Sequence, residues 1–199
     1  MKILVIGSEG STGKRYCKIL NDLGCKVLRY DLQDIKKDLP VSDKVIIASP
    51  TDTHFGYYRR LSLHDVNNVL IEKPACDKIS RLSSMFCKMV CNWAFVFPAM
   101  ILKPGKHEVL YNYHNTGNEG YWFDTCQLHI LSDGTGRIIN QSSSFSATIN
   151  DYFITEGMIE ASYSRMISAW LEAPELIWNV QDIIPELSYI IRKHEIANE

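Results

Sequence analysis

The chain has 199 residues, 46% of them hydrophobic and 22% charged, with a formal net charge of -2. This length suits one large domain or two small ones, and the composition is that of an ordinary soluble globular protein. The small net charge argues against nucleic acid or an acidic membrane surface as a partner, and the apolar runs are far shorter than a bilayer span.

The N-terminus and the cysteines indicate the compartment. Residues 1–7 contain one basic residue and too short an apolar stretch for a signal peptide, so a first strand is predicted there. The six cysteines form no CxxC pair and no regular framework. A chain of this length builds a core without disulfides. We therefore expect reduced thiols, no metal site and a cytoplasmic protein.

A glycine-rich turn follows the predicted strand over residues 3–6. A helix with apolar residues at helical spacing comes after the turn, and a second strand is predicted over 26–30. Glycines let backbone N–H groups approach a pyrophosphate closely, and a helix N-terminus adds its positive end. We therefore expect the turn to bind a dinucleotide through Gly7, Ser8, Gly10, Ser11, Thr12 and Gly13.

The acid that ends the second strand bears on the choice of dinucleotide. Asp31 can accept hydrogen bonds from ribose hydroxyls and repels a 2′-phosphate, which favours NAD(H). Arg29 lies two residues earlier and keeps NADP(H) possible. The glycine spacing is GxxGxxG rather than GxGxxG, and a P-loop is excluded because Arg15 stands where Ser or Thr is required. A structural glycine turn without a ligand is the alternative.

The next segments continue the alternation of strand and helix. Residues 31–44 are too few for a full helical crossover and a further strand, so one usual part of a nucleotide-binding domain is expected to be compressed. A strand is predicted over 45–48, and a helix over 55–64 is expected to be capped by Asp52 or Thr53.

A buried strand over 69–71 ends abruptly in Glu72, Lys73 and Pro74. Ligands of open α/β sheets bind at the carboxyl ends of such strands, where a catalytic or cofactor-contacting lysine is expected. The alternative is that Lys73 merely pairs with an acid at a strand end. A helix over 78–91, with Leu82, Met85, Phe86 and Met89 on one face, and a strand over 94–97 complete this half.

Three segments together resemble the glucose–fructose oxidoreductase/inositol dehydrogenase (Gfo/Idh/MocA) family. They are the glycine turn followed by Lys14-Arg15, the stretch Ala48–His54, similar to the family's A-T-P-x-x-x-H, and Glu72-Lys73-Pro74, similar to its E-K-P. The resemblance implies a hydride-transferring enzyme in which Lys73 is catalytic, beside the nicotinamide. It also implies a cofactor site that includes Ser49, Pro50, Thr51, His54, Glu72 and Lys73.

The C-terminal half is predicted to be a smaller domain. A strand is expected over 107–113, a helix over 121–131, and short antiparallel strands over 137–144, 146–150 and 152–155. Two closing helices are predicted from apolar stripes at Tyr163, Met166, Ile167, Trp170 and Leu171, and at Ile183, Ile184, Leu187, Ile190 and Ile191.

The family's second domain has a D-x-x-x-H pattern on a helix that lines the substrate. This chain has Asp124 and His129 five residues apart, a step that turns a helix by about 140° rather than keeping both on one face. Both are candidate catalytic residues, with His129 the candidate second proton-handling group. An ordinary packed histidine is the alternative.

We therefore expect a Rossmann-type doubly wound parallel sheet (1–97), followed by a small α+β domain with a reduced, mostly antiparallel sheet (98–199). The resemblance implies an NAD(P)-dependent oxidoreductase of a sugar, cyclitol or nucleotide-sugar-like substrate. A homo-oligomer through the C-terminal sheet is also implied. A non-catalytic dinucleotide-binding protein and a reductase of a linear tetrapyrrole are the alternatives.

Overall fold

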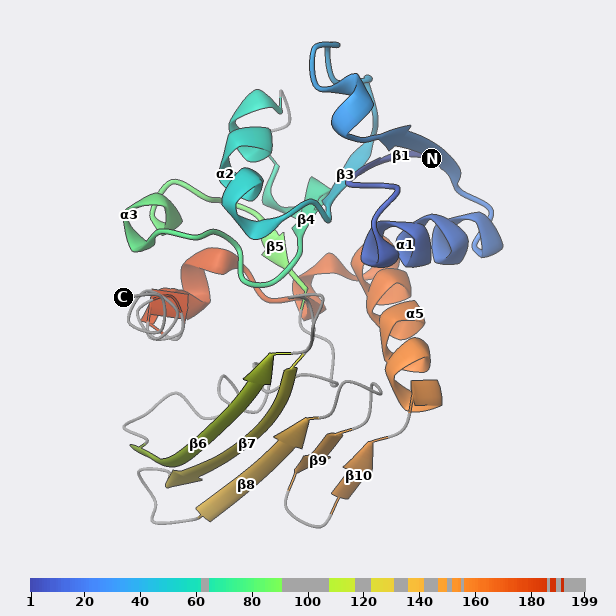
Figure 1. Ribbon diagram of the computed structural model, residues 1–199. Helices are drawn as coiled ribbons and strands as arrows, with labels where there is room; N and C mark the ends of the chain where they lie inside the picture. The colour runs from blue at the N-terminus through green and yellow to red at the C-terminus, as the bar shows by residue number, and fades with distance from the viewer. Residues whose placement is uncertain are drawn as a thin grey trace. The chain divides into compact units, whose positions relative to one another are not determined.

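The structure is a computed structural model in which most of the N-terminal half is described with its side chains. These residues are 1–61, 65–90, 161–185, 187, 188 and 191, and within 108–160 only the backbone of strands and of one helix start is described. Met1–Cys91 and Met166–Glu199 form the parallel-sheet unit, and Asn92–Arg165 form the antiparallel-sheet unit (Figure 1). The predicted boundary at 97/98 and the predicted strand over 94–97 lie outside the described residues.

Five strands of the parallel-sheet unit pair in the order β2-β1-β3-β4-β5. Their bounds are β1 Lys2–Ile6, β2 Lys26–Tyr30, β3 Lys44–Ile47, β4 Val69–Ile71 and β5 Lys88–Met89, and all pairings are parallel. The apolar residues of the three central strands are buried, as expected for a sheet covered on both faces. The strands predicted over 3–6, 26–30, 45–48 and 69–71 are therefore confirmed.

Two helices cover opposite faces of this sheet. α1, Ser11–Asp22, follows β1, and α2, Thr51–Arg60, follows β3 (Figure 1). Right-handed crossovers that leave β1 and β3 in opposite directions along the sheet place their helices on opposite sides. α1 buries Tyr16, Cys17, Ile19 and Leu20. Gly24, with a φ of 73°, turns the chain into β2 after α1 ends.

α2 begins earlier than its sequence suggested. Its N-cap is Pro50, and Asp52 and Thr53 lie in its first turn, so the expectation that one of them caps the helix is wrong. The hydroxyl of Thr53 instead lies 2.6 Å from the carbonyl oxygen of Pro50 and 2.8 Å from Oγ of Ser49. Proline at the cap fits because its missing N–H needs no partner there.

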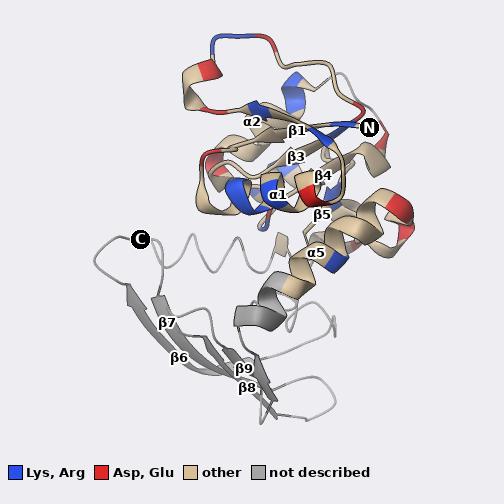
Figure 2. Cartoon of the chain, turned by 90° about the vertical axis from the view of Figure 1, so that its right-hand side faces the viewer, with Lys and Arg blue, Asp and Glu red and all other residues tan. Residues whose placement is uncertain are grey.

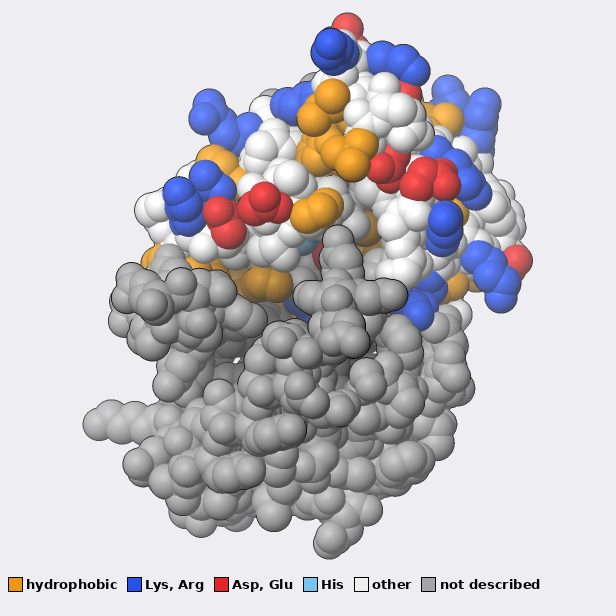
Figure 3. All heavy atoms as spheres, viewed as in Figure 1, with side chains coloured by type: hydrophobic (Ala, Val, Ile, Leu, Met, Phe, Trp, Pro, Cys, Tyr) orange, Lys and Arg blue, Asp and Glu red, His pale blue; other side chains and the backbone are white. Residues whose placement is uncertain are grey.

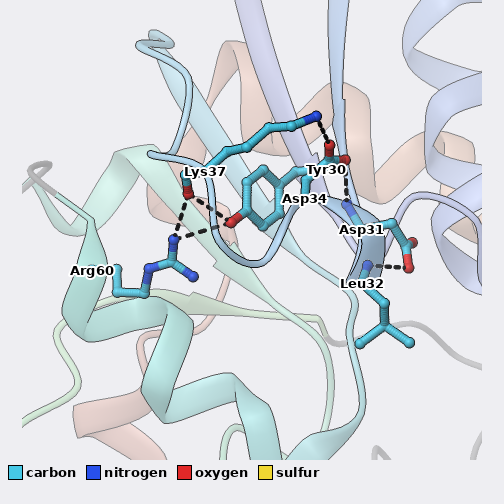
Figure 4. A network of polar contacts seen from close by, with 6 residues as sticks. All are labelled: Tyr30, Asp31, Leu32, Asp34, Lys37 and Arg60. Atoms are coloured by element: carbon cyan, nitrogen blue, oxygen red, sulfur yellow. Dashed lines mark hydrogen bonds and ion pairs between the residues drawn. The ribbon is translucent and has the colours of Figure 1, made fainter.

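The connection between β2 and β3 is the compressed part, as expected. Its regular structure is a 3₁₀ helix, Leu32–Asp34, and β2 is an edge strand. A polar network holds the connection against α2 (Figure 4): the guanidinium of Arg60 donates to the hydroxyl of Tyr30 at 3.0 Å and to the carbonyl of Lys37 at 2.9 Å. Lys37 also donates to a carboxylate oxygen of Asp34 at 2.6 Å.

The helix expected over 78–91 is wrong for most of its length. α3 spans only Ile79–Leu82, and Lys88–Met89 form strand β5 beside β4. The side-chain amide of Gln181 donates to the carbonyls of Leu82 and Met85, both at 2.9 Å, where α3 ends. Hydrogen bonds from the distant residue Gln181 thus replace the helical hydrogen bonds that the apolar spacing predicted. Phe86 is exposed and is not part of a buried face.

The closing segment completes the edge of the sheet at β5. The N–H of Met89 donates to the carbonyl of Trp178, and the N–H of Val180 donates to that of Cys87, both at 2.9 Å. The sequence assigns this segment to the second domain. In the structure it belongs to the parallel-sheet unit, because it satisfies backbone groups of the outermost strand.

α5, Glu156–Glu172, contains the predicted apolar stripe at 163–171. Trp170 is fully buried, and its indole N–H donates to the carbonyl of Asn67 at 3.0 Å. Nζ of Lys44 donates to the same carbonyl at 2.8 Å and lies 4.8 Å from the centroid of the Trp170 ring. These contacts fix the end of α5 to the amino end of β3 and to the residues before β4.

The antiparallel-sheet unit has the strand order β10-β9-β8-β7-β6. The bounds are β6 Glu108–Thr116, β7 Phe123–Ile130, β8 Gly136–Gln141, β9 Ala147–Ile149 and β10 Tyr152–Ile154. The helix expected over 121–131 is wrong, because β7 pairs with β6 on one side and β8 on the other. Among the helices of the described residues, none is long and apolar enough to cross a membrane.

Candidate functional site

The candidate site lies at the carboxyl edge of the parallel sheet, where the strand order reverses between β1 and β3. In open α/β sheets, ligands bind in the crevice at this position. Three segments reach it: the glycine loop 7–13 after β1, residues 48–54 after β3, and residues 72–75 after β4.

Packing of backbone against backbone shapes the glycine loop. Gly7 has a φ of 82°, and its N–H donates to the carbonyl of Tyr30 at 2.9 Å. A Cβ on Gly7 would lie 2.7 Å from backbone atoms of Ala48, and one on Gly13 would lie 1.9 Å from the carbonyl oxygen of Gly7. These two positions therefore require glycine.

Gly10 differs from the other two glycines. It is the N-cap of α1 with a φ of -66°, a conformation open to any residue. A Cβ there would come to 3.4 Å from the carbonyl oxygen of Gly7, an ordinary contact distance. Neither packing within the described residues nor backbone conformation requires glycine here, although glycine is among the residues favoured at an N-cap.

The N-terminus of α1 is open to an anion. The helix has no capping side chain and no acid in its first turn, and its partial positive end points to the carboxyl edge of β1. Lys14 and Lys18 of this helix are exposed, and Figure 2 shows the Lys and Arg colour on α1. In the coloured part of the face seen in Figure 3, Lys and Arg are interspersed with Asp and Glu, so the charge signs are mixed there.

Asp31 fixes the glycine loop to the end of β2. Its carboxylate accepts hydrogen bonds from the N–H of Glu9 and from the N–H of Leu32, both at 2.7 Å. Arg29 is paired with the carboxylate of Glu9 at 3.4 Å, and both of these side chains are about half exposed. The acid predicted from the sequence is thus at the loop, and the nearby cation is directed to Glu9.

His54 joins the segment after β3 to the segment after β4. It is buried, with Nε2 2.7 Å from the carbonyl oxygen of Ser49 and Nδ1 3.1 Å from that of Pro74. Burial lowers the pKa of His54, and this outweighs the opposite effect of the carbonyls and of Glu72. A neutral ring has one N–H, so it donates a hydrogen bond to only one of the two carbonyls, and the tautomer decides which.

Glu72 and Lys73 form a largely buried ion pair at the end of β4. Oε2 of Glu72 lies 3.5 Å from Nζ of Lys73 and accepts the N–H of Lys73 at 3.1 Å. The two side chains are only 10% and 12% exposed. Oε1 accepts a hydrogen bond from the hydroxyl of Tyr16 in α1. An amine fixed beside a carboxylate can hold or release a proton at this edge.

The structure brings the predicted residues of the first half together. Gly7, Ser8, Gly10, Ser11, Thr12, Gly13, Asp31, Ser49, Pro50, Thr51, His54, Glu72 and Lys73 all lie on the carboxyl side of β1–β4. Asp124 and His129 are positions in β7, and their side chains lie outside the described residues. Their meeting with Lys73 stays a prediction.

Tyr16 is the residue that sequence reasoning missed. It belongs to the apolar residues at helical spacing that predict the helix after the glycine turn, and it is fully buried. The signal that could have singled it out is its hydroxyl, because a buried tyrosine O–H usually has a hydrogen-bond partner.

Three solved structures with a similar fold are dehydrogenases. The WlbA (WbpB) dehydrogenase from Thermus thermophilus, in complex with NAD and alpha-ketoglutarate, aligns with a TM-score of 0.55 and 10% identity, covering 94% of this chain and 92% of that chain. A myo-inositol dehydrogenase from Corynebacterium glutamicum aligns with a TM-score of 0.53 and 11% identity, covering 94% and 93%. The WlbA dehydrogenase from Bordetella pertussis, in complex with NADH and UDP-GlcNAcA, gives 0.52 and 10%, covering 96% and 94%.

No family model matches the chain, and no curated protein matches its sequence. At such low identity the likeness to the solved structures shows the fold. The parallel-sheet unit therefore has the Rossmann-like α/β fold expected from the sequence.

The contact of Gly13 with Gly7 can be tested by two alanine substitutions. Gly13→Ala places a Cβ 1.9 Å from a backbone oxygen, so we expect a loss of about 3 kcal/mol in the free energy of unfolding. Gly56→Ala is the matched control, because a Cβ there meets nothing within 4 Å on an exposed helix face, and it should stabilise by about 0.5–1 kcal/mol. Urea denaturation measures both, and equal effects would contradict the packing argument.

The burial of His54 predicts a pH dependence of stability. The folded pKa is lowered from a usual value of about 6.5, so the unfolded chain binds this proton more readily. The stabilisation is complete above about pH 6.5 and is lost as the pH falls below it. In urea denaturation, wild type should lose more stability than His54→Gln between about pH 7.5 and about pH 5.5. Equal losses in the two proteins would show that His54 does not contribute.

Proposed function

We propose that this chain is an oxidoreductase of the Gfo/Idh/MocA family that uses a nicotinamide cofactor, with NAD(H) preferred to NADP(H). The reaction is hydride transfer between the cofactor and a hydroxyl or carbonyl carbon of a sugar, cyclitol or nucleotide-linked sugar. The observation that supports it most is the Lys73–Glu72 pair at the carboxyl end of β4, on the same sheet edge as the glycine loop.

The glycine loop supports a dinucleotide rather than a purely structural turn. Backbone packing explains why residues 7 and 13 are glycine. At Gly10, packing leaves space for a Cβ. A pyrophosphate that lies against the loop backbone would fill that space and accept hydrogen bonds from the first N–H groups of α1. Gly10 is then glycine because a side chain would collide with the ligand.

The preference for NAD(H) rests on Asp31. Two backbone N–H groups already bind its carboxylate, and the roughly four lone-pair positions of a carboxylate leave room for ribose hydroxyls. The same negative charge disfavours a 2′-phosphate. Arg29 would be the cation able to attract that phosphate, but it is paired with Glu9.

Lys73 would handle the proton at the substrate oxygen. The nicotinamide, when bound, supplies the hydride acceptor or donor. As a hydroxyl is oxidised to a carbonyl, its proton must leave, and an amine at the strand end can accept it; in the reverse direction the ammonium returns it. Glu72 provides the counter-charge that holds the amine in place. On the far side of Lys73, Nδ1 of the buried His54 ring lies 3.1 Å from the carbonyl oxygen of Pro74.

The substrate class is drawn from the family resemblance and from the neighbours. One structural neighbour is a myo-inositol dehydrogenase and another was solved with UDP-GlcNAcA. A second proton-handling group from Asp124 or His129, and association of two copies through the antiparallel sheet, belong to the same proposal.

Cofactor binding can be tested at Gly10. Gly10→Ala should lower the affinity for NADH about tenfold or more, because a Cβ would occupy the place of the pyrophosphate. Its stability should change by no more than about 1 kcal/mol, since Ala is only a poorer N-cap. Titration by NADH fluorescence measures the affinity, and NADPH measured in parallel should bind more weakly. Unchanged NADH affinity in a folded Gly10→Ala protein would contradict a pyrophosphate at this loop.

Catalysis can be tested at Lys73. Lys73→Ala should bind NADH within about threefold of wild type but lose turnover by about 100-fold or more. Lys78→Ala, at an exposed lysine nearby, is the matched control. The assay follows NADH absorbance with cyclitols, sugars, nucleotide-linked sugars and a linear tetrapyrrole. If wild type binds NADH but turns over none of these, the chain is a dinucleotide-binding protein and the proposed reaction fails.

A further inference from the structure

We propose that Tyr16 is a positioning residue for Lys73, acting through the carboxylate of Glu72. The proposal builds on the role given to Lys73 above. Tyr16 lies in α1, three residues after the last glycine of the loop, and its hydroxyl donates to Oε1 of Glu72 across 56 positions of sequence.

The two oxygens of Glu72 have separate partners. Oε1 accepts from Tyr16, whereas Oε2 faces both the backbone N–H and the Nζ of Lys73. A carboxylate is free to rotate about its last bond unless both oxygens are engaged. The Tyr16 hydroxyl removes that freedom, so the direction of Oε2, and with it the place of the amine, is set from α1.

Burial strengthens the hydrogen bonds that hold Glu72 and Lys73 in place. Tyr16 is fully buried, and the side chains of Glu72 and Lys73 are 10% and 12% exposed. Charged hydrogen bonds in such surroundings are stronger than in water, so each partner determines the position of the next. The backbone of Glu72 is also fixed, because its N–H donates to the carbonyl of Ile47 at 2.9 Å. The remaining freedom is that of the side chain, which Tyr16 restrains.

The hydrogen bond between Tyr16 and Glu72 connects the glycine loop, through α1, to the end of β4. α1 starts at the loop proposed to bind the pyrophosphate, and one turn later it orients the carboxylate that holds the amine. The helix thus relates the position of the cofactor phosphates to the position of Lys73. A displacement of a reacting group by about 1 Å can cost about 100-fold in rate, so a tyrosine with no contact to substrate can still control the reaction.

A purely structural role for Tyr16 predicts different behaviour. In that case the ring fills the core under α1, and the hydroxyl merely finds a partner. Tyr16→Phe keeps the ring and removes the hydroxyl, so it separates the two roles. Tyr58→Phe is the matched control, since the Tyr58 hydroxyl bonds to the backbone of Phe86, with its oxygen 2.8 Å from the N–H and 3.3 Å from the carbonyl.

The test measures the reactivity of the Lys73 amine directly and needs no substrate. Full-length wild type, Tyr16→Phe and Tyr58→Phe are labelled with trace acetic anhydride at neutral pH, and peptide mass spectrometry gives labelling at Lys73 relative to exposed Lys18. Release of the amine from Glu72 should raise labelling of Lys73 in Tyr16→Phe by about threefold to tenfold, the range set by the loss of one hydrogen bond. Tyr58→Phe should match wild type.

Unchanged or reduced labelling of Lys73 in Tyr16→Phe would overturn the proposal, as would an equal rise in Tyr58→Phe. Circular dichroism shows whether the variants are folded. If Tyr16→Phe does not fold, Glu72→Gln is tested in its place. Loss of the Glu72–Lys73 ion pair should make labelling of Lys73 faster. Unchanged labelling would refute control of the amine by this carboxylate.

Turnover gives a second reading where a substrate is found. Tyr16→Phe should lower kcat about 10- to 100-fold with the KM for NADH unchanged, whereas lowered stability alone would leave kcat per folded molecule unaltered. The two proposals fail separately. Labelling that rises in Tyr16→Phe without NADH binding supports the positioning role and refutes the oxidoreductase. If wild type binds NADH and turns over a substrate but Lys73 labelling is unchanged in Tyr16→Phe, the oxidoreductase is supported and the positioning role is refuted.

Discussion

The close approach of three backbone segments at the point where the strand order reverses determines the rest of the site. Gly13 lies against the carbonyl of Gly7, and Gly7 lies against Ala48, so the loop after β1 and the loop after β3 meet without side chains between them. This contact sets where α1 begins. The N-terminus of α1, the Tyr16 hydroxyl and the end of β4 take their relative positions from it.

Two polar connections extend this backbone contact across the sheet edge. The buried His54 ring lies between the carbonyls of Ser49 and Pro74, and the Tyr16 hydroxyl links α1 to Glu72. Lys73 thus lies between two polar side chains: Tyr16 restrains its amine through Glu72, and the His54 ring lies beside Pro74, the next residue. All of these groups are buried or nearly so, and a buried polar group that loses its partner is costly. The segment after β4 is therefore fixed although it has little regular structure of its own.

The fold positions this site with fewer helices and strands than a full dinucleotide-binding domain has. The connection between β2 and β3 lacks a crossover helix and a strand, and a network around Arg60 and Tyr30 holds it in place of packed secondary structure. At the other edge, the closing segment beyond α5 supplies the backbone partners of β5. The central strands, where the site lies, keep the usual order.

The sequence by itself determined the central strands, the glycine loop, Asp31 and the Glu72–Lys73 end of β4, because burial on both faces leaves apolar runs that end at polar or glycine residues. Only the tertiary structure decided that Lys88–Met89 and Phe123–Ile130 form strands, where spacing along the sequence had favoured helices. It also decided that Tyr16 bonds to Glu72 and that the closing segment pairs with β5. Such contacts join residues far apart in sequence, and local periodicity contains no information about them.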